Sequence, residues 1–200
     1  MDINKYLPKN LIESIYEDLS SKLDSKYHYH NLYHTKRVIN SAKEILMNFK
    51  LSEVDRKFLL TACLFHDYGF IKSHIDHEEI ATKMIHNILP EYNFTIDEIN
   101  IISSLILATK VDAIPCNDQE AIIRDADLEY LGSKDFERIS EYLKREWLEC
   151  GVINDSVSFY KIQYDFLSNH NFYTTYMKEK CGNQKEINLS YAKKMMESSH

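Results

Sequence analysis

The chain has 200 residues, enough to bury a substantial core, and its 44% hydrophobic and 28% charged residues are typical of a globular protein rather than a disordered one. Its net charge of −7 argues against duplex DNA or RNA as a partner, because neutralising phosphates requires a basic face. Residues 1–5 lack the apolar stretch of a signal peptide, and no apolar run reaches the ~20 residues of a membrane span. We therefore expect a cytoplasmic protein that does not bind membranes.

Apolar residues recur at helical spacing along most of the chain, whereas the alternation that is typical of strands is nearly absent. The pattern predicts an all-α fold with short connections. The expected helices cover about residues 9–23, 32–49, 53–67, 77–89, 96–109, 117–132, 133–150 and 155–168, and a last helix begins at about residue 186.

Polar residues at the expected helix starts and glycines at the expected ends support these boundaries. Ser52 with Asp55, and Thr95 with Glu98, have the spacing of a capping box. Each of the four glycines follows a helical pattern, where a left-handed residue commonly ends a helix. We expect that conformation at Gly69, Gly132, Gly151 and Gly182.

A histidine and an aspartate, His66 and Asp67, stand side by side at the end of the third expected helix. Burying this polar pair costs several kcal/mol unless something compensates it. A divalent metal would do so, because imidazole and carboxylate are both ligands for first-row metals. Taken alone, the pair is better explained as a polar helix end that faces water.

Two more polar residues lean toward the core from other expected helices. His34 lies on the apolar face of the helix over residues 32–49, and Asp127 lies at the border of an apolar face, whereas Asp125 points the opposite way and is expected to be solvated. Singly, each would be a hydrogen-bonded or salt-bridged core residue. Together with the His-Asp pair they supply two imidazoles and two carboxylates, a set that suits a six-coordinate divalent metal.

The order His…His-Asp…Asp on an all-helical chain resembles that of the HD-domain metal-dependent phosphohydrolases. Residues 29–34 (YHNLYH) look like the motif Y-H-N-x-x-H, and residues 64–67 (LFHD) look like L-x-H-D. Residues 76–81 (DHEEIA) are similar to the segment H-E-x-x-A. Thr109-Lys110 and residues 125–132 (DADLEYLG) are similar to the T-K and D-x-D-L-x-x-L-G segments of an uncharacterised subgroup of predicted HD phosphohydrolases.

The resemblance implies one helical domain of the HD type, with a metal-site core over about residues 29–131 on which helices over residues 133–200 pack. It implies a hydrolase in which metal-activated water attacks a phosphate mono- or diester, with a small-molecule nucleotide as the first candidate substrate. The sequence does not distinguish Mn, Mg, Fe, Co, Ni and Zn. The metal ligands are His34, His66, Asp67 and Asp127, and Asp67 also orients the attacking water.

The chain departs from HD proteins with two metals, which carry further histidines after the His-Asp pair. Thr109 and Lys110 end the helix where one of those histidines is usual. We therefore favour one ion over two, while His77 or His74 leaves a second ion open.

Four further residues are candidates for catalysis or substrate binding. Glu78 is either a general base or a carboxylate favoured by a helix start. Arg37 binds either a phosphate or a surface acid, and Lys110 either meets a phosphate or caps its helix. His77 completes the set of candidate substrate-binding residues.

Three alternatives to the hydrolase stay open. The same ligand types serve HD-fold iron oxygenases and hydratases. The missing histidine on the fifth helix leaves room for a metal- or nucleotide-binding sensor without turnover. A purely structural helical bundle is the remaining alternative, and the oligomeric state is not predicted.

Overall fold

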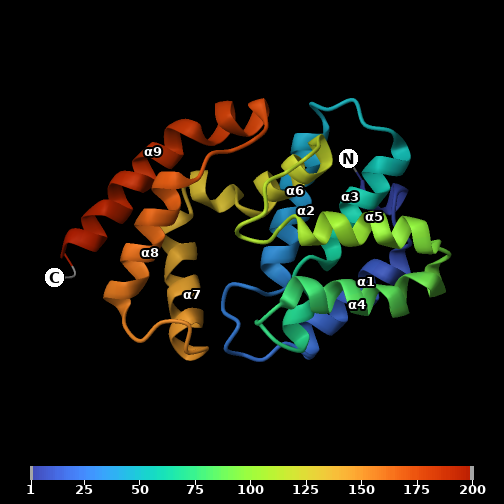
Figure 1. Ribbon diagram of the computed structural model, residues 1–200, viewed down its shortest axis with the longest axis horizontal. Coiled ribbons are helices and arrows are strands. Elements are labelled where there is room, and N and C mark those ends of the chain that lie inside the picture. Colours follow the sequence, from blue (N-terminus) through green and yellow to red (C-terminus); the bar gives the residue numbers. More distant parts are fainter. Residues whose placement is uncertain (1, 199–200) are drawn as a thin grey trace. The chain divides into compact units, whose positions relative to one another are not determined.

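The computed structural model describes residues 2–198, and helices without any strand make up its regular structure in this range. The all-α prediction is therefore confirmed for these residues. None of the helices described is both long and apolar enough to cross a bilayer. The α-helices, labelled in Figure 1, are α1 (Lys9–Ser21), α2 (Leu32–Leu46), α3 (Glu53–Phe65), α4 (His77–Ile88), α5 (Ile96–Leu107), α6 (Asp118–Asp127), α7 (Phe136–Glu149), α8 (Ser156–Asn169) and α9 (Thr175–Ser198).

The described residues form two compact units. The N-terminal unit comprises the residues up to Asp24 together with His30–Asp127, and the C-terminal unit comprises Ser25–Tyr29 with the residues from Leu128 onward. The packing of residues 133–200 on the core over residues 29–131 stays a prediction. All four proposed metal ligands belong to the N-terminal unit.

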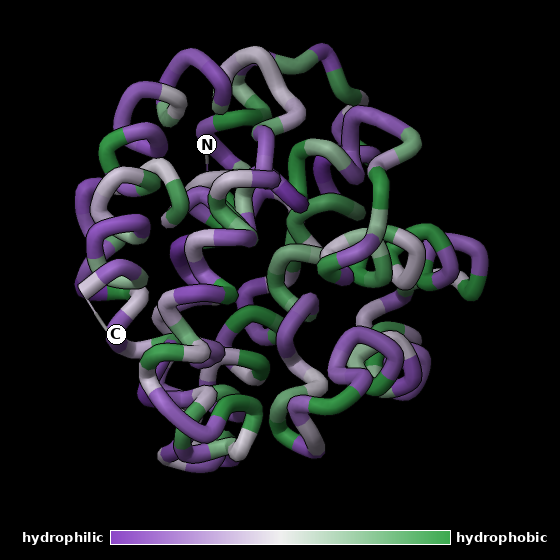
Figure 2. The backbone as a smooth tube through the Cα atoms, turned by 60° about the vertical axis from the view of Figure 1, so that its left-hand side comes forward, coloured by the Kyte–Doolittle hydropathy of each residue, from purple (hydrophilic) through white to green (hydrophobic). Residues whose placement is uncertain are grey.

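Helix α3 is the central element of the N-terminal unit. Every residue over Phe58–Phe65 is buried, and the helix packs against α1, α2, α5 and α6. A helix that is apolar on all sides has to be enclosed in this way. The other helices of the unit carry both buried and exposed residues, and Figure 2 shows hydrophobic and hydrophilic stretches interspersed along the backbone. The His-Asp pair therefore begins where the most deeply buried helix ends.

Short polar side chains define where helices begin, as predicted. Ser52 caps α3 and accepts a hydrogen bond from the Asp55 amide at 3.0 Å. Thr95 and Glu98 form a complete capping box at α5. These interactions satisfy amide groups that lack a partner within the helix.

Several predicted helix boundaries differ from those observed, such as the end of the second helix at Leu46 and the start of the seventh at Phe136. The last helix starts at Thr175 rather than near residue 186, because the Thr174 hydroxyl caps it by accepting from the Met177 amide at 3.2 Å. Gly182 lies inside this helix and does not end it, since packing of α9 against α8 outweighs the ~1 kcal/mol cost of a helical glycine. The sixth helix ends at Asp127, and a short 3-10 segment, Glu129–Gly132, follows it.

The expectation of four left-handed glycines is wrong for three of them. Only Gly151 has a positive φ, 69°. Gly69 lies in the 3-10 segment η2 (Tyr68–Ile71), where a Cβ atom would come within 1.9 Å of the His77 carbonyl oxygen. Gly69 is therefore required by the close approach of η2 to the start of α4, and not by its own backbone conformation.

We expect Gly69→Ala to lower the free energy of unfolding by about 3 kcal/mol, because the backbone of α4 has to move to admit the methyl group. Gly182→Ala is the matched control. No atom lies within 4 Å of its added Cβ, so a gain of about 0.5–1 kcal/mol is expected from helix propensity. Urea denaturation followed by circular dichroism measures both, and an unchanged midpoint for Gly69→Ala would contradict the explanation.

Candidate metal centre

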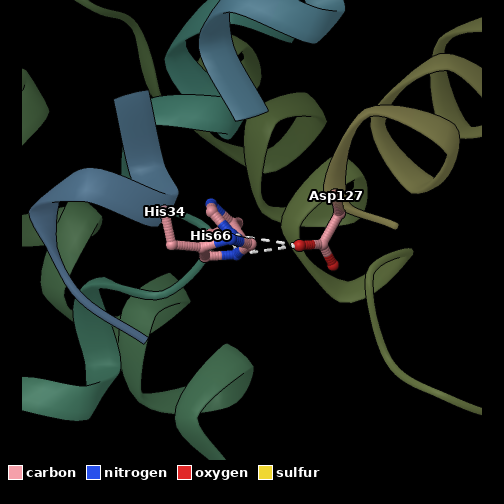
Figure 3. Close-up of side chains that lie close together, drawn as sticks. All are labelled: His34, His66 and Asp127. Carbon is pink, nitrogen blue, oxygen red and sulfur yellow. Dashed lines mark hydrogen bonds and ion pairs between the residues drawn. The ribbon is translucent and has the colours of Figure 1, made fainter. Parts of the chain in front are cut away.

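Three helix ends of the N-terminal unit carry the four predicted metal ligands. His34 lies in the first turn of α2, whose N-cap residue Asn31 accepts from the His34 amide at 3.4 Å. His66 is the C-cap of α3 and Asp67 follows it, while Asp127 is the last residue of α6. Figure 3 shows His34, His66 and Asp127 pointing toward one another from these helices.

The donor atoms of these side chains converge closely. His34 Nε2 lies 3.1 Å from His66 Nε2, 3.2 Å from Asp67 Oδ2 and 3.0 Å from Asp127 Oδ1. His66 Nε2 lies 3.1 Å from Asp67 Oδ2 and 3.5 Å from Asp127 Oδ1. His34, His66 and Asp127 thus meet the geometry of a group that can hold a metal ion.

These spacings fit a common metal ion. Metal bonds of about 2.1 Å at right angles place neighbouring ligand atoms about 3.0 Å apart. Asp67 is only 6% exposed, and no hydrogen bond of normal geometry reaches its Oδ2 from the described residues. A buried carboxylate oxygen in that condition is costly, and a cation bound beside it would compensate the cost. The donor set and its spacing are therefore suited to a divalent metal.

A contact between the His66 ring and a backbone carbonyl fixes the orientation of this imidazole. Its Nδ1 lies 3.0 Å from the carbonyl oxygen of Cys63, one turn earlier in α3. When Nδ1 donates its proton to that carbonyl, Nε2 points toward the other proposed metal ligands. This is the usual way in which a protein selects the tautomer of a metal-binding histidine.

The charges within the cluster stabilise one another strongly. Burial alone would lower the pKa of both rings, but Asp67 and Asp127 outweigh it and raise the pKa of His34, and that of His66 well above the ordinary 6.5. Burial alone would raise the pKa of the two carboxyl groups, but the histidines hold the pKa of Asp67 and that of Asp127 below their usual range. The metal-free cluster therefore retains protons on its imidazoles.

His77 and Glu78, at the start of α4, are brought next to the cluster. His77 Nε2 lies 3.4 Å from Asp67 Oδ1 and 3.4 Å from Glu78 Oε1. Burial alone would lower the pKa of His77, but Asp67 raises it. Asp67 consequently presents Oδ2 to the two histidines and Oδ1 to His77, so the possibility of a second ion stays open.

Arg37 and Lys110 are the two remaining candidate residues for substrate binding. The Lys110 ammonium forms an ion pair with Glu79, which offsets its charge. Arg37 is half-buried one turn beyond His34, and its role in binding stays a prediction. Lys110 does line a pocket of about 530 Å³ together with His77 and Glu78.

Two residues that precede Asp127 in α6 differ from expectation. Asp125 was expected to be solvated but is fully buried, because α6 packs against α2, α3 and α5 and has little free surface. Arg124 is a functional candidate that the sequence did not reveal. It is 6% exposed and its guanidinium donates to the carbonyl oxygens of Ala108 and Val111 at 2.7 and 3.2 Å, and also to that of Lys110.

Comparison with known proteins gives one match. The family model described as "HD domain" matches residues 31–129, a range that contains all four converging side chains. No curated protein and no solved structure matches the chain.

We expect Mn²⁺ to raise the thermal unfolding midpoint of the metal-free protein. An ion that binds only the folded state stabilises it by about 2.7 kcal/mol at a hundredfold excess over its Kd. Asp127→Asn should remove most of this shift, whereas Asp118→Asn, at the exposed first turn of the same helix, should keep it. Circular dichroism with and without Mn²⁺ measures the effect, and an undiminished shift in Asp127→Asn would exclude Asp127 as a ligand.

Metal binding should also release protons. The raised pKa of His34 and that of His66 mean that the folded, metal-free rings hold protons above pH 6.5, and a ligand has to lose its proton. The stability that these protonated rings contribute is complete below pH 6.5 and is lost as the pH rises through their raised values. The metal-free unfolding midpoint should therefore fall with rising pH while metal affinity rises. Calorimetry in buffers of different ionisation enthalpy measures the release, and buffer-independent heats would contradict it.

Proposed function

The chain belongs to the HD-domain family, and on that premise we propose that it is a divalent-metal-dependent phosphohydrolase acting on a phosphate mono- or diester. The observation that carries the proposal is the convergence of His34, His66 and Asp127 at 3.0–3.5 Å, with Asp67 Oδ2 at 3.1–3.2 Å from the two imidazoles. Desolvation makes a buried cluster of this kind an inefficient way to stabilise a fold, which favours a role in binding an ion.

In the proposed reaction, His34, His66, Asp67 and Asp127 hold the ion. Such an ion lowers the pKa of water and offsets negative charge on a phosphoryl oxygen. Asp67 turns its Oδ1 away from the histidine pair, toward His77, and orients the attacking water from that side. Water forms the new bond to phosphorus as the ester oxygen leaves.

Glu78 is the proposed acceptor of the proton from that water. The residue is 8% exposed, and its carboxylate lies 3.4 Å from His77 Nε2. Burial beside an imidazole keeps the Glu78 carboxylate close to the reacting groups and away from bulk water. A base positioned in this way accepts a proton efficiently. The departing alcohol takes its proton from the solvent side of the pocket.

The proposed substrate is a small molecule, with a nucleotide as the first candidate. A net charge of −7 disfavours a long polyanion, so duplex nucleic acid is not proposed as a partner. A sensor that binds the same ligand without turnover is the second candidate. The feature that favours it is α5, which carries no histidine and is followed by a lysine already paired with Glu79.

We expect Asp67→Ala to abolish metal-dependent hydrolysis while leaving helical content nearly intact. Glu78→Gln should lower kcat by about 10²–10⁴-fold with metal content retained, because it removes only the proton acceptor. Elemental analysis of the purified protein, followed by a phosphoester panel with the identified metal restored, makes the measurement. Metal-free Asp67→Ala with full activity would refute the mechanism, and tight nucleotide binding without product would favour the sensor.

A further inference from the structure

A pocket of about 530 Å³ in the N-terminal unit lies beside the proposed metal centre. His77 connects the two, because it lines the pocket and its Nε2 lies 3.4 Å from Asp67 Oδ1. Glu78 lines the pocket next to it. His77 is therefore the residue that the pocket shares with the surroundings of the metal centre, and the pocket is the cavity available to a substrate bound there.

The pocket is acidic. Three carboxylates line it, from Asp76, Glu78 and Asp112. Its one lining lysine, Lys110, is in an ion pair with Glu79, which lies outside the lining, so the lysine charge is already offset. His77 also lines the pocket and pairs with Glu78 at 3.4 Å, so the excess negative charge comes from Asp76 and Asp112. An anionic group entering the pocket would be repelled by these two carboxylates, whereas a cationic group would be attracted.

The buried side chain of Arg124 holds the backbone of one wall of the pocket in place. Arg124 donates to the carbonyl oxygens of Ala108, Lys110 and Val111, and Lys110 and Val111 both line the pocket. A guanidinium that binds several carbonyls at the C-terminal end of α5 is favoured by the helix dipole. The acidic lining is therefore presented by an ordered wall, to which Val111 and Ala113 add apolar surface.

We propose that this pocket receives the leaving group of the substrate and selects a phosphomonoester whose leaving group carries a positive charge, such as an alkylammonium. The proposal rests on the phosphohydrolase function proposed above. A second phosphate or a carboxylate in the same position is rejected by Asp76 and Asp112. Among nucleotides, monophosphates are accordingly preferred over di- and triphosphates.

The test uses three phosphonates of equal length that differ only in their far end: 3-aminopropylphosphonate, butylphosphonate and 3-carboxypropylphosphonate. Calorimetric titration of the metal-loaded full chain should give affinities in that order, with about tenfold or more between the ammonium and the carboxylate. The difference should shrink as salt is added, because two of the carboxylates are exposed.

The double variant Asp76→Asn with Asp112→Asn should reduce the ratio of the ammonium to the carboxylate affinity to about threefold or less. Asparagine tolerates the left-handed backbone at position 76, where φ is 52°. Glu91→Gln, at an exposed acid outside the pocket lining, is the matched control and should keep the full ratio.

Equal affinities, a preference for the carboxylate, or no binding of any of the three would overturn the proposal. Hydrolysis of the corresponding 2-aminoethyl, propyl and 2-carboxyethyl phosphates is measured in parallel. Hydrolysis without a binding preference would be consistent with the phosphohydrolase function and would refute the proposal that the pocket selects a cationic leaving group. The predicted binding order without any hydrolysis would support the acidic, cation-selecting pocket and refute the phosphohydrolase.

Discussion

The approach of Asp67 and Asp127 to the paired imidazoles of His34 and His66 is the interaction on which this structure depends. Without an ion it holds together because protons remain on His34 and His66 opposite Asp67 and Asp127. A buried cluster of this kind is a poor source of stability, since desolvation offsets most of the attraction. The donor types and their spacing suit a cation, and the matching HD-domain range encloses all four residues.

The surrounding helices are arranged so that this cluster can form. Helix α3 is enclosed along its whole second half, so its end places His66 at a fully buried position. Gly69 then lets the chain pass against the start of α4, and that close approach sets His77 next to Asp67. The tight packing at Gly69 thus determines where His77 lies relative to Asp67.

Much of the candidate site was predictable because its signals are local. The adjacent pair of His66 and Asp67 at the end of an apolar run, and His34 on an apolar face, follow from residue order and helical period. Arg124 and the burial of Asp125 were not predictable in this way. Both depend on how many neighbours enclose α6, a quantity that the periodicity of one helix does not contain.

The sequence by itself determined the all-α class, the helix starts at Ser52 and Thr95, and the set of residues able to bind a metal, because caps and periodicity act over a few residues. Only the tertiary structure decided that the donor atoms stand at ligand spacing. It alone explained Gly69, and it alone placed Lys110 in an acidic pocket, paired with Glu79. These features join residues far apart in the chain, and their distances are set by packing.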